Sequence, residues 1–224
     1  MGEIIRLENV VKMYENSRRA INDVSFTINE HESICVYGAS GSGKTSLMKL
    51  IAGIEAPSDG SIYVKDKEVH NMDSDTAADF RNQNFGILAR HHGLLDSLTV
   101  FENVTMPLAI RKVAVAKRRL SAMEQLKTLG IAHLANAYPP QLSNMELQLA
   151  GVGRALVGEP NILLVANIDS RLTKKEQEKL YGLLYAIWKF SELTLIRFTD
   201  RENSGLPYDR HFCLEFGKIT EDIK

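Results

Sequence analysis

The sequence predicts an α/β domain built on a mainly parallel sheet. Apolar runs that read as buried strands alternate along the chain with segments whose apolar residues recur at helical spacing, and this alternation is typical of such folds. Between one strand and the next helix, residues 38–45 read GASGSGKT, which fits the phosphate-loop pattern GxxxxGK[ST]. The two observations predict the fold class and an anion-binding site within it.

The phosphate loop is the best-defined feature of the sequence. It follows the apolar residues 34–37 and precedes a helical pattern over residues 47–51. Its glycines let successive backbone N–H groups point at an anion, and the helix start adds positive charge. Lys44 would serve the β- and γ-phosphates, and the Thr45 hydroxyl would reach a weakly held Mg²⁺. We therefore predict that ATP or ADP is bound by Gly38, Ala39, Ser40, Gly41, Ser42, Gly43, Lys44, Thr45 and Ser46.

The remaining strands of the first half are predicted from short apolar runs. Residues 4–7 read as a strand, followed by the run at residues 10–14, and a second strand is expected at residues 24–28, which alternate strictly between apolar and polar. A hairpin near the surface is expected over residues 62–69, and residues 85–88 read as a short central strand.

Three Ser/Thr-x-x-Glu capping boxes, at residues 99–102, 143–146 and 173–176, predict helix starts. Pro107 lies inside the first of these helices and would kink or shorten it. Gly130 is expected to end the helix that follows.

Further apolar strands are predicted at residues 162–166, 193–198 and 211–216. The helical stretch between them and the first strands reads as an insertion. We expect one nucleotide-binding domain over residues 1–224, with a core of residues 1–95 and 159–224 and a helical subdomain at about 96–158.

Composition narrows the functional classes. The 224 residues are 44% hydrophobic and 25% charged, as in an ordinary globular protein, and the formal net charge of -1 gives no general attraction to nucleic acid. The two cysteines lie in apolar runs, which suits buried thiols rather than a disulfide framework. We expect neither a signal peptide nor a membrane span, so a position at a membrane would require a partner.

Several further motifs occur at characteristic positions along the chain. They are Lys12-Met13-Tyr14, Pro57-Ser58-Asp59-Gly60, residues 98–104 (LTVFENV), Gln141-Leu142-Ser143, Arg154-Ala155-Leu156 and Glu159-Pro160. With the phosphate loop, they make the chain resemble the ATP-binding subunits of ABC transporters over nearly its whole length. The resemblance is greatest to the branch that serves lipoprotein release, macrolide export and bacitracin resistance.

This resemblance implies a RecA-like P-loop NTPase core, an antiparallel β-edge and an inserted helical subdomain. It also implies a head-to-tail dimer, in which the loop of one subunit and the signature helix of the other clamp each ATP. Tyr14 matches the aromatic residue that stacks on adenine in the family, although a tyrosine packed in the core or a hairpin is the alternative interpretation.

The chain departs from the family at the positions that perform hydrolysis. Arg90 stands where a glutamine coordinates Mg²⁺ and the attacking water, and a guanidinium cannot ligate a metal. At the end of the Walker B strand, Ala166 replaces the aspartate that holds the Mg²⁺ shell, and Asn167 replaces the general base. Thr173 replaces the D-loop aspartate, and Thr199 replaces the switch histidine.

The signature motif is changed as well, because LSGGQ becomes Leu142-Ser143-Asn144-Met145-Glu146. Two glycines that allow a close backbone approach to the opposing nucleotide are lost. Asn144 and Met145 are expected to add bulk there, and Glu146 to add negative charge, although Glu146 also fits a helix cap.

We therefore predict an ATP-binding subunit of an ABC-transporter-like membrane complex that hydrolyses ATP weakly or not at all and acts as a nucleotide-dependent regulator or clamp. The alternative is an active ATPase that energises export, or lipoprotein or peptide release, through a membrane permease. The predicted partners are a permease-like membrane subunit and either a second copy of this chain or an intact ABC ATPase subunit. The implied location is the cytoplasmic face of the cell membrane, through the partner.

Overall fold

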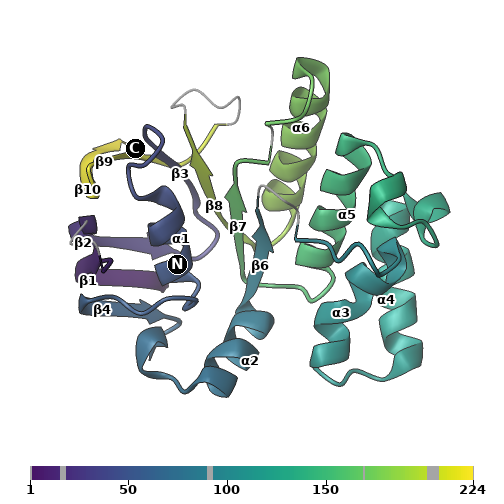
Figure 1. Cartoon of the computed structure of the whole chain (residues 1–224), viewed down its shortest axis with the longest axis horizontal. Helices are drawn as coiled ribbons and strands as arrows, with labels where there is room; N and C mark the ends of the chain where they lie inside the picture. Colours follow the sequence, from purple (N-terminus) through teal and green to yellow (C-terminus); the bar gives the residue numbers. More distant parts are fainter. Residues whose placement is uncertain (1, 16–18, 90–92, 169, 201–206, 224) are drawn as a thin grey trace. The chain divides into compact units, whose positions relative to one another are not determined.

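The computed structural model describes residues 2–15, 19–89, 93–168, 170–200 and 207–223 (Figure 1). The chain divides into two compact units. The first unit comprises Met1–Arg81 and Ala186–Lys224, and the second comprises Asn82–Tyr185. Helices α2 and α6 run across the two boundaries.

The first unit contains an antiparallel sheet with the strand order β2-β1-β4-β5. The predicted strand at residues 4–7 and most of the run that follows it form a single strand, β1. Its register against β2 shifts between Leu7 and Val10, where Asn9 has a φ of 48°. A bulge of this kind lets a strand continue past an irregular residue. The strands are β1 (Glu3–Met13), β2 (Arg19–Asn29), β4 (Asp59–Val64) and β5 (Lys67–Glu68).

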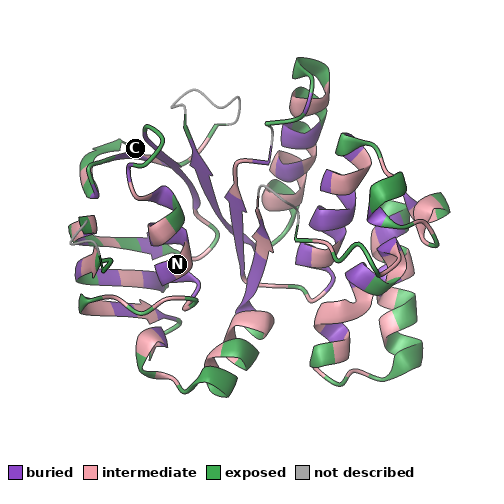
Figure 2. Cartoon of the chain, viewed as in Figure 1, coloured by how far each residue is buried: buried purple, intermediate pink, exposed green. Residues whose placement is uncertain are grey.

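The first unit also contains the strand that leads into the phosphate loop. This strand, β3, pairs in parallel with β8 on one side and β9 on the other, and β10 continues the sheet antiparallel to β9. Every residue of β3 and β8 is buried (Figure 2), as expected for strands covered on both faces. The four strands are β3 (Ser33–Tyr37), β8 (Thr194–Thr199), β9 (Arg210–Glu215) and β10 (Lys218–Ile223).

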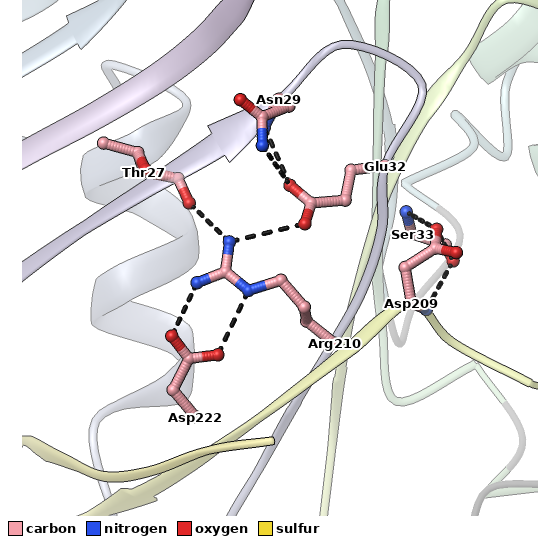
Figure 3. A network of polar contacts seen from close by, with 7 residues as sticks. All are labelled: Thr27, Asn29, Glu32, Ser33, Asp209, Arg210 and Asp222. Atoms are coloured by element: carbon pink, nitrogen blue, oxygen red, sulfur yellow. Dashed lines mark hydrogen bonds and ion pairs between the residues drawn. The ribbon is translucent and has the colours of Figure 1, made fainter. Parts of the chain in front are cut away.

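A buried arginine ties this sheet to the end of β2 (Figure 3). The Arg210 guanidinium donates to both carboxylate oxygens of Asp222, at 3.1 and 2.6 Å. It also donates to the Thr27 carbonyl at 2.8 Å and to Glu32 at 3.4 Å, and it lies 4.7 Å from the centre of the Phe212 ring. The network joins residues of β2, β9 and β10 that are far apart in the sequence.

The two α-helices that begin in the first unit differ in how clearly their sequences predict a helix. Helix α1 packs against β2, β4 and β8 and buries its apolar residues, as its spacing predicts. Helix α2 was not predicted: it is polar, and Asn84 is its one buried residue, so the apolar periodicity that identifies a surface helix is missing. The bounds are α1 (Lys44–Ile51), a 3₁₀ turn η1 (Val69–Asn71) and α2 (Ser74–Asn84).

The second unit combines a parallel strand pair with packed helices. Strand β6 pairs with β7 and stands last in the strand order, so the prediction of a central strand at residues 85–88 is wrong. Helix α3 packs against α4 and α5, and α5 packs against β6. The elements are β6 (Phe85–Leu88), α3 (Val100–Ile110), α4 (Val115–Thr128), η2 (Ala132–Leu134), η3 (Pro139–Gln141), α5 (Asn144–Leu156), β7 (Ile162–Ala166) and α6 (Lys174–Phe190).

All three capping boxes form. Thr99 and Ser143 each accept a hydrogen bond from the backbone of the glutamate three residues on, and Thr173 does the same. Pro107 does not shorten α3, which continues to Ile110 and buries Leu108. Across the described ranges, the helices lack the combination of length and apolar character that a membrane span requires.

Candidate functional site

The phosphate loop has the close backbone packing that its sequence predicts. A Cβ on Gly38 would lie 2.1 Å from the Leu214 carbonyl oxygen, so a side chain there would collide with β9. Gly43 has a φ of 114° and forms the N-cap of α1, a backbone conformation that favours glycine. Inside the loop, the Ser42 N–H donates to the Ala39 carbonyl at 3.1 Å. The loop therefore has a curled backbone that larger residues would disrupt.

The loop presents its polar groups where an anion could approach the start of α1. Ala39, Ser40 and Gly41 are exposed, and so is Thr45 in the first turn of the helix. The eight-residue helix adds the N–H groups of its first turn and its dipole to the same place. The residues present fit the phosphates of a nucleotide.

Lys44 is almost fully buried, with an exposed fraction of 6%. Its ammonium donates to the carbonyl oxygens of Gly38, at 2.6 Å, and Ala39, at 2.9 Å. The Asp200 carboxylate lies 3.0 Å from the same nitrogen. Sequence reasoning did not assign Asp200 to the site, although it follows directly after β8, and no local motif connects it with Lys44.

Tyr14 is held at the start of the same helix. Its hydroxyl donates to Glu55 at 2.7 Å and lies 3.1 Å from the Ser46 hydroxyl. The Lys49 ammonium also donates to Glu55, and this hydrogen bond is the largest cause of the lowered pKa of Glu55. Tyr14 is 39% exposed, so it is not a core residue. Its hydroxyl contact with Ser46 places it beside α1. Its role in stacking on adenine stays a prediction.

The signature-equivalent residues form the start of α5 in the second unit. The Ser143 N–H and hydroxyl both donate to the Glu146 carboxylate, at 2.8 and 2.7 Å, and they lower the pKa of Glu146. Met145 is buried, with 8% exposed, so its bulk faces the interior of the unit rather than the surface. Asn144 is exposed, and its amide donates to the Arg171 carbonyl at 3.2 Å. Glu146 is thus a helix cap.

The positions expected to perform hydrolysis carry few suitable groups. Ala166 ends β7 half-buried, and Asn167 follows it with a φ of 49°, a left-handed conformation that asparagine tolerates well. Thr173 is engaged as the cap of α6, where its hydroxyl donates to Glu176 at 2.7 Å. Thr199 is buried at the end of β8 in the first unit. Arg90 lies outside the described residues.

The donor set fits Mg²⁺ poorly. A hard divalent cation prefers carboxylate and other oxygen ligands. In the first unit, Thr45 offers one hydroxyl, and the Asp200 carboxylate is already paired with Lys44. In the second unit, the methyl group of Ala166 offers no ligand atom. Within the described part of the chain, no cluster of three or more His, Cys, Asp or Glu side chains is arranged to hold a metal ion.

Comparison with known proteins agrees with the loop and the fold. The sequence pattern of the ABC transporter family matches residues 21–167. The chain is 30% identical, over 98% of its length and 100% of the relative, to the lipoprotein-releasing system ATP-binding protein LolD of Cytophaga hutchinsonii. It is 29% identical, over 97% of its length and 98% of the relative, to LolD of Psychrobacter arcticus.

A solved structure is similar along the whole chain. The structure of the ATP-binding cassette MJ0796, a dimer in a post-hydrolysis state bound to ADP and Pi, has a TM-score of 0.91 and 28% sequence identity. The similarity covers 99% of this chain and 98% of that one. From the matched family pattern and the full-length relatives, we conclude that this chain is a member of the ABC transporter family.

Proposed function

We propose that the chain is the nucleotide-binding subunit of an ABC-transporter-like membrane complex, and that it hydrolyses ATP weakly or not at all. The proposal rests on a contrast between the phosphate loop, which keeps its binding groups, and the end of β7, which lacks carboxylates. The loop keeps its glycines, its buried lysine and its exposed helix start. The end of β7 carries alanine and asparagine where hydrolysis requires carboxylates.

Binding and hydrolysis require different groups. Binding a nucleotide through a phosphate loop needs backbone N–H groups, a helix start and a cation, all of which Gly38 to Ser46 supply. Hydrolysis also needs a base that orients and activates water, and the Asn167 amide accepts no proton near neutral pH. Loss of a general base typically costs about 10²–10⁴-fold in rate. The expected role is therefore that of a nucleotide-dependent regulator or clamp.

The same proposal includes partners. The MJ0796 relative is described as a dimer, and the LolD relatives belong to a lipoprotein-releasing system. By analogy, this chain would pair with a second copy or with an intact ATPase subunit, and would be held at the cytoplasmic face of the membrane by a permease-like protein. It would act as one nucleotide-binding domain with a helical subdomain at about residues 96–158.

A binding titration tests the first part. A fluorescent ATP analogue is titrated into the purified chain with and without EDTA, alongside Lys44→Ala as the control. We expect binding that depends on Lys44 and changes little with EDTA, because the donor set fits Mg²⁺ poorly. No binding at millimolar nucleotide, or binding that EDTA abolishes, would contradict this part of the proposal.

The second candidate function is an active ATPase that energises export or release through a permease. It is favoured by the relatives, whose full length the chain matches and which are named as ATP-binding proteins of a releasing system. Phosphate release distinguishes the two candidates. Turnover by the purified chain that requires Mg²⁺ and is lost in Lys44→Ala would favour the active enzyme.

A further inference from the structure

The ammonium group of Lys44 has its bonds satisfied within the first unit. Two loop carbonyl oxygens, those of Gly38 and Ala39, accept hydrogen bonds from it at 2.6 and 2.9 Å. The Ser42 hydroxyl lies at 3.5 Å, and the Asp200 carboxylate at 3.0 Å. The positive charge of Lys44, which a phosphate would require, is therefore already paired with the carboxylate of Asp200.

The sheet explains why Asp200 reaches the loop. Strands β3 and β8 are parallel and adjacent, and Tyr37 at the end of β3 is in register with Thr199 at the end of β8. The next residues, Gly38 and Asp200, therefore leave the sheet at the same edge. The carboxylate needs no long reach to meet Lys44, and its side chain keeps 57% of its surface exposed.

The loop itself also holds Lys44. The two carbonyl oxygens fix the ammonium from within the loop, and the side chain of Lys44 is 6% exposed. Asp200 therefore adds a negative charge beside an ammonium that the loop already holds. A phosphate that binds at Lys44 must either displace this carboxylate or lie beside it. Displacement breaks the ion pair with Lys44, and lying beside the carboxylate brings like charges together, so both cost free energy.

We propose that Asp200 is a specificity determinant of the phosphate loop, which makes the site favour nucleoside diphosphates over nucleoside triphosphates. The inference rests on the proposed nucleotide binding. The repulsion grows with the negative charge that the ligand brings to Lys44, and a triphosphate brings more charge than a diphosphate. A neutral residue at position 200 would remove this discrimination.

The test compares ATP and ADP affinities by calorimetric titration in EDTA at low ionic strength. The variants are Asp200→Asn and, as the matched control, Asp66→Asn, which makes the same change in net charge in the exposed turn between β4 and β5. We expect Asp200→Asn to bind ATP roughly tenfold and ADP roughly threefold more tightly than the parent chain, and salt to reduce both gains. Asp66→Asn should leave the ratio of the two affinities unchanged.

Three results would overturn the inference: equal gains for ATP and ADP, no gain, or weaker binding by Asp200→Asn. Asp200→Ala provides a second variant, and thermal melts verify that both variants fold. If the parent chain binds ATP in a Lys44-dependent way but Asp200→Asn leaves the ratio of the ATP and ADP affinities unchanged, only the specificity inference fails. If neither the parent chain nor any variant binds ATP, ADP or tripolyphosphate, the proposed nucleotide binding fails and this inference fails with it.

Discussion

Restoring the two lost carboxylates, with Ala166→Asp and Asn167→Glu, distinguishes a missing base from a site impaired in several places. A base is worth about 10²–10⁴-fold, so its return alone could bring a large gain. The structure adds a cost. Asn167 has a φ of 49°, and a left-handed conformation costs most L-residues roughly 1–2 kcal/mol, with asparagine among the exceptions.

Other features that we propose to limit hydrolysis remain in the repaired chain. The Ser143 hydroxyl is already bonded to the Glu146 carboxylate at 2.7 Å, so it would have to break this cap before it could reach an opposing nucleotide. Arg90 and Thr199 would still lack the groups that orient water. A misplacement of about 1 Å can cost on the order of 100-fold in rate. We therefore expect little turnover from the repaired chain alone, and more when it is paired with a subunit that carries an intact signature.

The assay is phosphate release, with Ala166→Asp/Asn167→Gln as the matched control. Glutamine has the length and the backbone strain of glutamate but accepts no proton. Both double variants should have a free energy of unfolding about 1 kcal/mol lower than that of the parent chain, because of the backbone strain at position 167. If the glutamate variant alone hydrolyses ATP at about 1 s⁻¹ or faster, the low end of ordinary turnover, while the glutamine variant does not, the signature is no barrier and the reasoning is refuted.

Three further predictions concern the first unit. Arg210→Met should lower the free energy of unfolding in urea by about 2 kcal/mol, because the Thr27 carbonyl and the Glu32 carboxylate, whose side chain is 14% exposed, lose the donor that Arg210 supplies. Arg210→Lys should lose less, and an unchanged midpoint would contradict the assigned network. Glu55→Gln should cost about 0.5–1 kcal/mol at pH 7. Since Lys49 lowers the pKa of Glu55 from 4.5, the carboxylate stabilises the fold above that pH and loses this effect as the pH falls through its folded pKa, so denaturation in acid should show no difference. Gly43→Ala would place a Cβ 2.2 Å from a carbonyl oxygen of β2; titration should show nucleotide binding lost, and retained affinity would refute the close packing.

Features whose signals lie within a few neighbouring residues could be predicted from the sequence. The phosphate loop is such a feature, since its glycines, lysine and threonine are contiguous and stand between an apolar strand and a helix. Capping boxes such as the one at Ser143 also depend on two residues three positions apart. The buried strands β3 and β7 were predicted because strands covered on both faces need continuous apolar runs.

Contacts between residues far apart in the chain, and elements with weak apolar patterns, could not be predicted in this way. The contact of Asp200 with Lys44 arises because β8 lies beside β3, and no periodicity encodes that adjacency. Helix α2 and strand β10 were missed because they bury little apolar surface, so their stabilising contacts leave no pattern in the sequence. The burial of Met145 likewise follows from packing within the second unit, because sequence alone does not reveal which side of a helix start faces the core.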